Sequence, residues 1–391
     1  MLVSVIIPFY KWFDGIPAIL SLKVDIEDKL EFIIVINGKK HLSDQIRKAC
    51  FCHNSGEKIF HFVELGENKG AAVARNAGLA VASGSVIVFL DSDIIPEESL
   101  LVKHVQHYKA NRHTTGVLGD VRFFDIKNLL QKAVHSSGFD GGFVYPSEML
   151  LDWGPTANIS FSREAIGLLR FDTSFPKQGG GEDVDFGIQV TEKTKTPIIT
   201  DNEAICHHKM WNGSMNNCKR FFRWGSAEYL LMQKHPDRVY LAYPNYFELP
   251  VILFLLYLFF GAVMGVYWLP LLSIGNWSLI TFIESKLKLL NSDSHKSNPI
   301  NIEKTNPTSF TISIISDFFL FVYEAGSFYG RLRNFSINNL IFHRFDYEPL
   351  ERRDASKVNR EVKKRVFFQA FIYSIIILIE FLIIIIMKKT F

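Results

Sequence analysis

Two aspartates separated by one residue follow a short apolar run. The run Val86 to Leu90 is apolar at every position, and Asp91-Ser92-Asp93 comes directly after it. Such a run is typical of a strand buried on both faces, and open α/β sheets bind ligands at the carboxyl ends of their strands. Carboxylate oxygens suit Mg²⁺ or Mn²⁺. The pair therefore predicts a divalent-cation site, although Asp-Ser-Asp is also ordinary turn composition.

A glycine run followed by acids forms a second candidate site. The glycines at 179–181 lead directly into Glu182, Asp183 and Asp185. Acids in the first turn of a helix are stabilised by the helix dipole, and Glu182 and Asp185 can be explained in this way alone. A carboxylate held there can also take a proton from a hydroxyl group, as a general base does. The residue types leave both interpretations open.

The segment 68–78, Asn-Lys-Gly-Ala-Ala-Val-Ala-Arg-Asn-Ala-Gly, is a third candidate. Gly70, preceded by Lys69, lets the backbone approach a ligand, and a helix that begins here favours an anion at its N-terminus. Arg75 and Asn76 follow about one and a half turns later. From that position they can reach the base or the ribose of a nucleotide.

Two histidines follow an apolar pair at Ile205 and Cys206. A neutral imidazole can complete the coordination of a cation. If this stretch is a strand, His207 shares a face with Ile205, and His207 is therefore our first choice over His208. A pair of surface histidines explains the same residues.

Four motifs taken together resemble glycosyltransferase family 2. They are V-S-V-I-I-P-F-Y at 3–10, N-K-G-A-A-V-A-R-N-A-G at 68–78, V-F-L-D-S-D at 88–93 and G-G-G-E-D-V-D-F at 179–186. The resemblance covers most of residues 1–225 and implies a GT-A-type α/β fold with a Rossmann-like, mostly parallel sheet. It implies an inverting transfer of a sugar from a nucleotide diphosphate donor, with Asp183 as the catalytic base.

The resemblance also implies where the donor and the cation bind. Mn²⁺ or Mg²⁺ is expected on Asp91, Asp93 and His207. The family commonly has an acid after the second strand that contacts the donor base, and this chain has Ile36 and Asn37 there. Asn37 can substitute as a hydrogen-bonding group, so UDP is favoured but not fixed. The expected donor-binding residues are Pro8, Asn37, Lys69, Gly70, Arg75, Asn76, Asp91 and Ser92.

The acceptor side is expected to include Trp153, Glu182, Arg223 and Trp224. The indole of Trp153 can stack on a sugar ring or pack in the core, and the sequence does not separate the two. Processive members of the family carry Q-x-x-R-W where this chain has R-F-F-R-W at 220–224, which argues against processive synthesis. Basic and aromatic residues at helical spacing from 219 to 232 are typical of an interfacial helix, the interpretation that we favour.

The elements that must position these residues form a parallel α/β pattern. Apolar runs alternate with helical patterns, as expected for strands covered by helices. A helix is predicted at 71–82, and Pro96 is predicted in the first turn of the next helix. The predicted strands lie at 2–7, 32–36, 60–65 and 86–90.

The apolar excess of the chain lies after Leu249. The segment 249–274 is uncharged, 366–387 has Glu380 as its charge, and 310–329 contains two acids. Because about 20 apolar residues cross a bilayer, two or three transmembrane helices are predicted. The two acids of 310–329 predict that this segment faces protein or lies in the interface if it does not span. In an alternative arrangement, residues 249–283 form a hairpin and 310–329 lies flat.

A basic stretch follows these segments. Residues 331–365 hold ten Lys and Arg against five Asp and Glu. The positive-inside rule favours a cytoplasmic position for this loop, together with the catalytic half. We therefore predict a catalytic domain at 1–225, an interfacial linker at 226–248 and a membrane-associated region at 249–391 of a multi-pass inner or plasma membrane protein.

Composition excludes other classes of function. A net charge of +3 is too small to argue for a nucleic-acid partner, and the N-terminus has neither the basic region nor the cleavage site of a signal peptide. The expected partners are a nucleotide sugar, a glycan or lipid-linked acceptor and a membrane, in cell-envelope glycan or glycolipid synthesis. The alternatives are a processive polysaccharide synthase and a non-catalytic nucleotide-sugar-binding protein, and the presence of Asp91, Asp93 and Asp183 argues against the latter.

Overall fold

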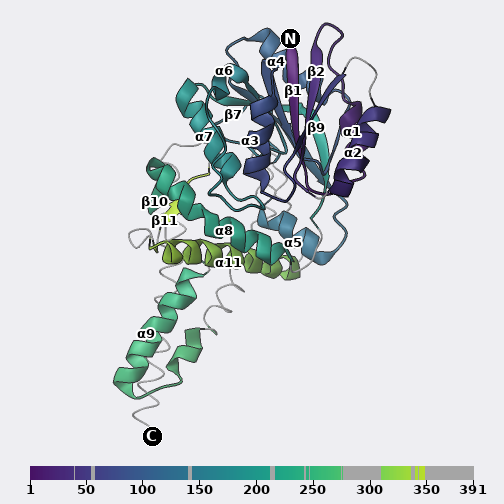
Figure 1. Cartoon of the computed structure of the whole chain (residues 1–391). Helices are drawn as coiled ribbons and strands as arrows, with labels where there is room; N and C mark the ends of the chain where they lie inside the picture. The colour runs from purple at the N-terminus through teal and green to yellow at the C-terminus, as the bar shows by residue number, and fades with distance from the viewer. Residues whose placement is uncertain are drawn as a thin grey trace.

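The continuous apolar runs of the sequence form neighbouring strands of one mixed β-sheet in the computed structural model. The structure describes residues 1–38, 40–53, 58–139, 143–211, 216–241, 244–245, 247–273, 275, 310–335, 340–341 and 343–347. The predicted strands are confirmed as β1 (Leu2–Phe9), β2 (Lys29–Ile36), β3 (Lys58–Glu64) and β4 (Val86–Leu90). The middle residues of β1, β2 and β4 are buried because helices cover both faces of the sheet, whereas those of the edge strand β3 are half-buried (Figure 1).

The sheet is mostly parallel, as the resemblance implies. Its order is β3-β2-β1-β4-β8-β6-β9-β5, with β7 paired to β9. Strands β3, β2, β1 and β4 are parallel, and β8 is antiparallel to both β4 and β6, so that β6 and β9 run in the same direction as β4. The other strands are β5 (Ile94–Pro96), β6 (Gly116–Phe124), β7 (Leu150–Leu151), β8 (Asn158–Ser162) and β9 (Ile198–Lys209).

Two hydrophobic clusters lie on the two faces of the sheet. One face packs against α1 (Ile16–Ser21), α2 (Lys40–Cys52) and α4 (Leu100–Ala110). The other face packs against α3 (Ala71–Val81), α6 (Arg163–Ile166) and α7 (Glu182–Thr194). Helix α3 confirms the prediction at 71–82.

The prediction for Pro96 is wrong. Pro96 ends strand β5, opposite Cys206 of β9, and α4 begins at Leu100. A proline is tolerated at the end of an edge strand because its missing N–H takes no place in the ladder. Pairing with β9, which is distant in sequence, therefore decides the structure of this segment.

Two long helices lie side by side below the sheet. They are α8 (Asn216–Lys234) and α11 (Phe310–Arg333), with α5 (Leu129–Ser137) beside α11 (Figure 1). Asp317 of α11 is buried, so this helix turns an acid toward protein, one of the two positions expected for its acids. The expected domain boundary at residue 225 falls inside α8, which packs against both the sheet domain and α11.

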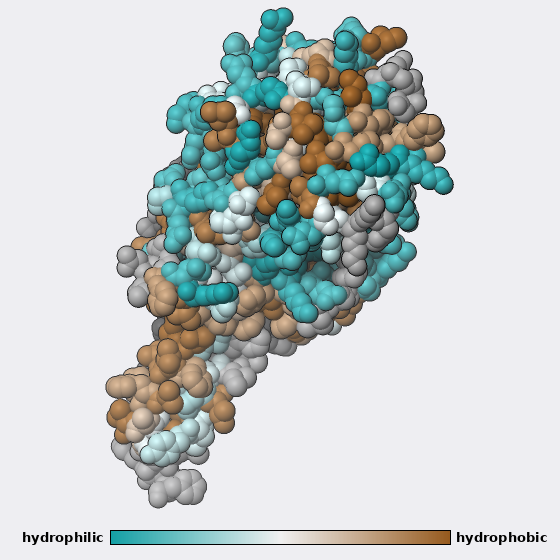
Figure 2. Space-filling model, in the orientation of Figure 1, coloured by the Kyte–Doolittle hydropathy of each residue, from teal (hydrophilic) through white to brown (hydrophobic). Residues whose placement is uncertain are grey.

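One apolar helix points away from the sheet domain. Helix α9 (Glu248–Met264) projects beyond α11, and its surface is largely hydrophobic (Figures 1 and 2). It ends at Gly265, after which η2 (Leu269–Leu271) packs back on it. The predicted span 249–274 is therefore not one continuous helix, and the reversal agrees with a hairpin.

Among the described residues, one helix, Phe310–Arg333, is long and apolar enough to cross a membrane, and 39% of its apolar window is buried inside the protein. The predicted span 366–387 lies outside the described residues, as does most of the basic loop 331–365. Arg331 is not in a loop: it lies in the last turn of α11, buried against Glu248. A short sheet follows, in which β11 (His343–Phe345) pairs with β10 (Val239–Leu241), next to η1 (Pro236–Arg238).

Candidate functional site

The aspartate pair lies at the carboxyl end of β4, as predicted. The side chains of Asp91 and Asp93 are 36% and 35% exposed, so both carboxylates can reach a ligand. Ser92 between them is buried. The pair therefore offers two oxygen donors at one edge of the sheet.

His208, and not His207, is the histidine beside this pair. Its Nε2 lies 3.3 Å from Oδ2 of Asp93, whereas Nε2 of His207 lies 3.1 Å from Glu97. Our first choice was therefore wrong about the side of the strand. The alternation along β9 holds, but Cys206 and His208 face the aspartates, while Ile205 and His207 face away.

The two aspartates titrate differently because their neighbours differ. Burial and the charge of Asp93 raise the pKa of Asp91, against the lowering effect of Arg75. Burial also acts to raise the pKa of Asp93, but the hydrogen bond and charge of His208 hold it below its ordinary value. Asp93 is thus ionised at neutral pH and ready to bind a cation.

Arg75 links the aspartate pair to the first turn of α7. Its Nη2 donates to Asp91 and its Nη1 donates to Glu182, each at 3.1 Å. The arginine is 5% exposed, and the charges of Asp91, Glu182 and Asp183 raise its pKa although burial opposes this. Arg75 is therefore occupied by protein acids, in contrast to the expectation that it contacts the base or the ribose.

The glycine run gives α7 its entry. Gly179, Gly180 and Gly181 all have positive φ, at 84°, 146° and 102°, which side chains other than glycine rarely adopt. The N–H of Gly180 donates to Glu182 at 2.8 Å. This turn presents the next residue, Asp183, beside Glu182, and burial together with the charge of Glu182 raises the pKa of Asp183 to about 7. A carboxyl group with such a pKa suits a general base.

Two of the expected donor-binding residues, Asn37 and Asn76, are hydrogen-bonded to loops of the protein. Asn37 is 4% exposed and fixes the 68–70 loop, since it donates to the carbonyl of Gly70 and accepts from the N–H of Lys69 at 2.8 Å. Asn76 exchanges two hydrogen bonds with the backbone of Phe171, so it holds a loop and is not directed at a nucleotide. Pro8, near the end of β1, lies beside Val35 of β2.

Gly70 is placed as the motif predicts. Its φ is +100°, it caps α3, and a Cβ there would lie 2.9 Å from Cα of Lys177. The helix N-terminus behind it is an anion site by its free N–H groups, although the N–H of Ala71 is already bound by the carbonyl of Lys177. The 68–70 loop and the 177–181 loop therefore meet at the site.

Two arginines of α8 face the same region. Arg223 donates to the carbonyls of Gly179 and Gln178, both at 3.2 Å, and so supports the glycine run. Arg220 lies on the indole of Trp211, 4.5 Å from the ring centre, and its Nη1 is buried without a hydrogen-bond partner. Burial and the charge of Arg223 lower the pKa of Arg220 to about 10, whereas Asp93 acts in the opposite direction.

The two tryptophans expected on the acceptor side are partly buried. Trp224 lies in an aromatic cluster with Trp211 and Phe221. Trp153 packs edge-on against Tyr347, 5.9 Å between ring centres, and its indole N–H donates to the carbonyl of Tyr347 at 3.0 Å. Trp153 is thus a packing residue, and its neighbour Tyr347 lies 194 residues later in the sequence.

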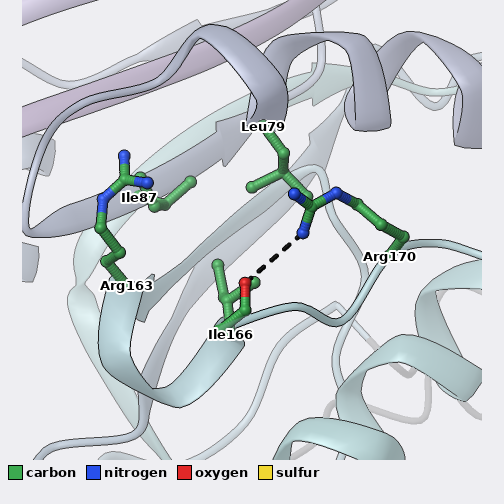
Figure 3. A pocket seen from close by; sticks show the side chains of 6 residues that line it. Leu79, Ile87, Arg163, Ile166 and Arg170 are labelled. Atoms are coloured by element: carbon green, nitrogen blue, oxygen red, sulfur yellow. Dashed lines mark hydrogen bonds between the residues drawn. The ribbon is translucent and has the colours of Figure 1, made fainter.

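Two other features are not part of this site. Among the described residues, one cluster of acids is close enough to hold a metal, Asp25, Glu27 and Asp28, but the ammonium group of Lys109 lies within 3.0 Å of all three. A cavity of about 20 Å³ near the start of β4 has room for one water molecule. Figure 3 shows Arg163 and Arg170 on either side of it, with Arg170 donating to the carbonyl of Gly167.

Sequence reasoning missed two residues of the site, His208 and Arg220, and also Tyr347, the residue that packs against Trp153. The sequence pattern Ile205–His207 points to His207, and only the pairing of β9 with β5 and β6 shows that His208 lies beside Asp93. Arg220 was noted as a departure from Q-x-x-R-W, without a role. Tyr347 gives no local signal, because its place depends on a strand pair between β10 and β11 that are distant in sequence.

Part of this chain is similar to known proteins. The family model described as glycosyl transferase family 2 matches residues 4–160. An uncharacterized protein of Haemophilus influenzae is 31% identical over 102 residues, 26% of this chain and 52% of that protein. An uncharacterized glycosyltransferase of Rickettsia felis is 28% identical over 158 residues, 37% of this chain and 23% of that protein. The chain thus spans about half the length of the first relative and about a quarter of the second.

A second Haemophilus influenzae relative is covered more completely. It is an uncharacterized glycosyltransferase, 26% identical over 220 residues, which are 56% of this chain and 83% of that protein. Among solved structures, the mannosyltransferase PcManGT from Pyrobaculum calidifontis, in complex with GDP-Man and Mn²⁺, has a TM-score of 0.48 and 15% identity. That match covers 82% of this chain and 87% of the other.

Proposed function

We propose that this chain, whose residues 4–160 match the model of glycosyl transferase family 2, belongs to that family. It transfers a sugar from a nucleotide diphosphate donor to a hydroxyl group of an acceptor, with inversion at the anomeric carbon. The favoured donor is a UDP-sugar. The favoured acceptor is a glycan or lipid-linked molecule at a membrane, in the synthesis of cell-envelope glycan or glycolipid.

The observation that carries this proposal is the bridge made by Arg75. It joins Asp91, the first residue after β4, to Glu182, the residue before Asp183, by two bonds of 3.1 Å. The cation-binding pair and the carboxylate with a pKa of about 7 therefore lie around one side chain. A transferase needs both at one place, because the leaving group and the attacking hydroxyl group meet at the same carbon.

The chemistry requires one proton transfer and one substitution. Asp183 accepts the proton of the acceptor hydroxyl group as its oxygen forms a bond to the anomeric carbon. The bond from that carbon to the distal phosphate oxygen breaks, and its electron pair leaves with the nucleoside diphosphate. Attack opposite the leaving group inverts the configuration.

The half-exposed carboxylates of Asp91 and Asp93, with the imidazole of His208 beside them, fit Mn²⁺ or Mg²⁺ in donor type. Such a cation, when bound, neutralises the charge that grows on the diphosphate. Arg220 would add a second positive charge, since its buried Nη1 has no protein partner and Asp93 is among the charges that act on it.

Membrane association is part of the proposal. Helix α9 exposes large apolar side chains along most of its length, and a bilayer is the medium that can cover them. Helices α8 and α11 then lie along the membrane surface, with the catalytic domain in the cytoplasm. The acceptor would reach Asp183 from the membrane side.

The test is a screen of the purified full-length protein against UDP-glucose, UDP-galactose, UDP-N-acetylglucosamine and GDP-mannose. Each donor is incubated with a bacterial lipid extract, with and without Mn²⁺, and products are detected by mass spectrometry. We expect one donor to be consumed in a Mn²⁺-dependent reaction that yields a nucleoside diphosphate and a glycosylated product. If no donor binds or reacts, the proposal is wrong.

A further inference from the structure

The chain that follows α11 returns to the catalytic domain. Strand β11 pairs antiparallel with β10, with Val239 opposite Phe345, and the N–H of Asp346 donates to the carbonyl of Arg238 at 2.9 Å. Phe345 is 3% exposed and packs in a cluster with residues of α7 and α8. The positions of Asp346 and Tyr347 are therefore fixed by the catalytic domain.

Tyr347, two residues later, lies beside the first turn of α7. Its ring belongs to the same cluster as Val184 and Ile188, and Val184 is the residue after Asp183. On the other side Trp153 packs edge-on against it and donates to its carbonyl. Tyr347, which is half-buried, thus lies next to Trp153 and to the turn that carries the proposed base.

The hydroxyl group of Tyr347 is held from the side of α11. Its Oη lies 3.2 Å from Oη of Tyr323, which donates to Glu228 at 3.5 Å. Either hydroxyl group can donate across this bond, and in both cases the oxygen of Tyr347 keeps a lone pair with which it can accept another hydrogen bond. Burial, followed by the charge of Glu228, raises the pKa of Tyr347 well above its ordinary value, so the phenol stays protonated.

We propose that Tyr347 is an acceptor-binding residue: its ring and hydroxyl group form the surface beside Asp183 on which a sugar ring of the acceptor lies. This inference rests on the proposed function and adds that Tyr347 recognises the acceptor. An aromatic ring suits the apolar face of a sugar, and a phenol oxygen that can accept suits a sugar hydroxyl group. The same tyrosine is anchored through Tyr323 to α11, the helix beside the proposed membrane surface.

The experiment compares Tyr347→Ala and Tyr347→Phe with wild type in the full-length protein. It uses the donor and the lipid extract that support transfer by wild type in the screen above, and titrates the extract at saturating donor. A second reaction without extract measures slow hydrolysis of the same donor by water. Tyr240→Ala, which alters the half-exposed tyrosine of β10, is the matched control for a change in the small sheet.

For Tyr347→Ala we expect the apparent KM for the extract to rise at least about tenfold, with the donor KM and the rate of donor hydrolysis within about twofold of wild type. Tyr347→Phe keeps the ring and should recover part of the loss. Tyr240→Ala should behave as wild type.

Two results would overturn the inference. An unchanged KM for the extract in Tyr347→Ala would remove the contact with the acceptor. An equal loss of hydrolysis and transfer, with a lower midpoint of thermal unfolding, would show that Tyr347 only supports the fold. If wild type itself neither binds nor consumes any donor, the proposed function fails, and the inference fails with it.

Discussion

Arg75 sets the distance between the two halves of the site. Its bond to Glu182 is almost hidden from solvent, where loss of one partner of such a pair typically costs about 3–5 kcal/mol, whereas Asp91 is partly exposed. The acids therefore lie at fixed positions before any substrate binds. This arrangement makes the roles of single residues separable by mutation.

Asp183→Asn is expected to lower transfer about 10²–10⁴-fold, because the amide cannot accept the proton of the acceptor. Mn²⁺-dependent binding of UDP, measured by calorimetry, should stay within a few fold of wild type. The matched change Asp93→Ala should instead remove the Mn²⁺ dependence of UDP binding. Wild-type transfer rates in both variants would contradict the assignment of the site.

The pKa of Asp183 predicts a pH dependence. A base must be deprotonated to act, so kcat/KM should rise with pH up to about 7 and then level off, at saturating Mn²⁺. Because the charge of Glu182 helps to raise this pKa, Glu182→Gln should shift the rise of kcat/KM toward lower pH. A rate profile of the variant that coincides with that of wild type would speak against Asp183 as the titrating group.

The same raised pKa has an opposite effect on stability. A carboxyl group whose pKa is raised on folding stabilises the protein at low pH, and this contribution is lost as the pH rises through about 7. Above that pH, Asp183→Asn should therefore unfold at the same or a higher temperature than wild type, as scanning calorimetry can measure. A clearly lower unfolding temperature would mean that the loss of transfer reflects misfolding.

Arg220→Ala tests whether this arginine binds the diphosphate. Removal of a charged hydrogen-bond donor from a buried anion costs about 1.5–3 kcal/mol, so the KM for the donor should rise at least about tenfold. Lys219→Ala, which changes the exposed neighbour in the same turn, should leave it within about twofold. If both changes raised the KM for the donor equally, Arg220 would act on the donor through its positive charge at a distance and not through a direct hydrogen bond.

At the scale of single residues, the sequence predicted which residues lie at the site better than it predicted which groups they contact. Asp91, Asp93 and Gly70 lie where the motifs place them, because a strand end and a helix entry are local features. Arg75 and Asn76 were expected on the nucleotide but are bound by Glu182 and by the backbone of Phe171, which lie about a hundred residues away along the chain. No local pattern predicts such partners.

At the scale of helices and strands, the packing of α8 on α11 depends on two glycines. A Cβ at Gly225 would lie 1.9 Å from the carbonyl oxygen of Tyr323, and a Cβ at Gly326 would lie 2.1 Å from that of Phe222. The two backbones are in direct contact at these points. This contact sets the height at which Tyr323 meets Glu228 and Tyr347.

Gly326→Ala is therefore expected to push the helices apart and to destabilise the protein by about 1–3 kcal/mol, as overpacking does. It should also raise the KM for the acceptor, because Tyr323 moves with α11. Thr311→Val, at an exposed position in the first turn of the same helix, is the control and should change neither quantity. Thermal unfolding and the acceptor titration measure both effects, and an unaltered unfolding temperature would contradict the close contact.

Strands were predicted more accurately than the elements around them. The apolar runs at 2–7 and 86–90 are buried from both sides, so their own composition determines their structure. The sequence around Pro96 carries both a helix-start signal and strand residues, and pairing with β9 decides between them. The domain boundary expected at 225 stays a prediction, and α8 continues across that residue to contact α11.

At the scale of the whole molecule, α9 and the pair α8–α11 define an orientation. Helix α9 has 17 residues, which corresponds to about 26 Å and is somewhat short of the roughly 30 Å of a hydrocarbon core. Its end at Gly265 and the packing of Leu269 against Tyr257 turn the chain back. A helical hairpin inserted from one side fits these features better than a single continuous span over 249–274.

Site-specific labelling distinguishes this orientation from an α9 that packs on protein. A fluorophore sensitive to polarity is attached to Leu255→Cys, whose native side chain is 57% exposed, in a background with Cys52→Ser and Cys218→Ser. In vesicles we expect a blue-shifted emission that lipid-bound quenchers reduce and aqueous iodide does not, because exposed apolar side chains are driven out of water. Ile26→Cys, at a fully exposed position of the catalytic domain, is the control and should be quenched by iodide alone. If both labels responded to iodide alike, α9 would lie in water, and the acceptor would have no membrane side from which to reach Asp183.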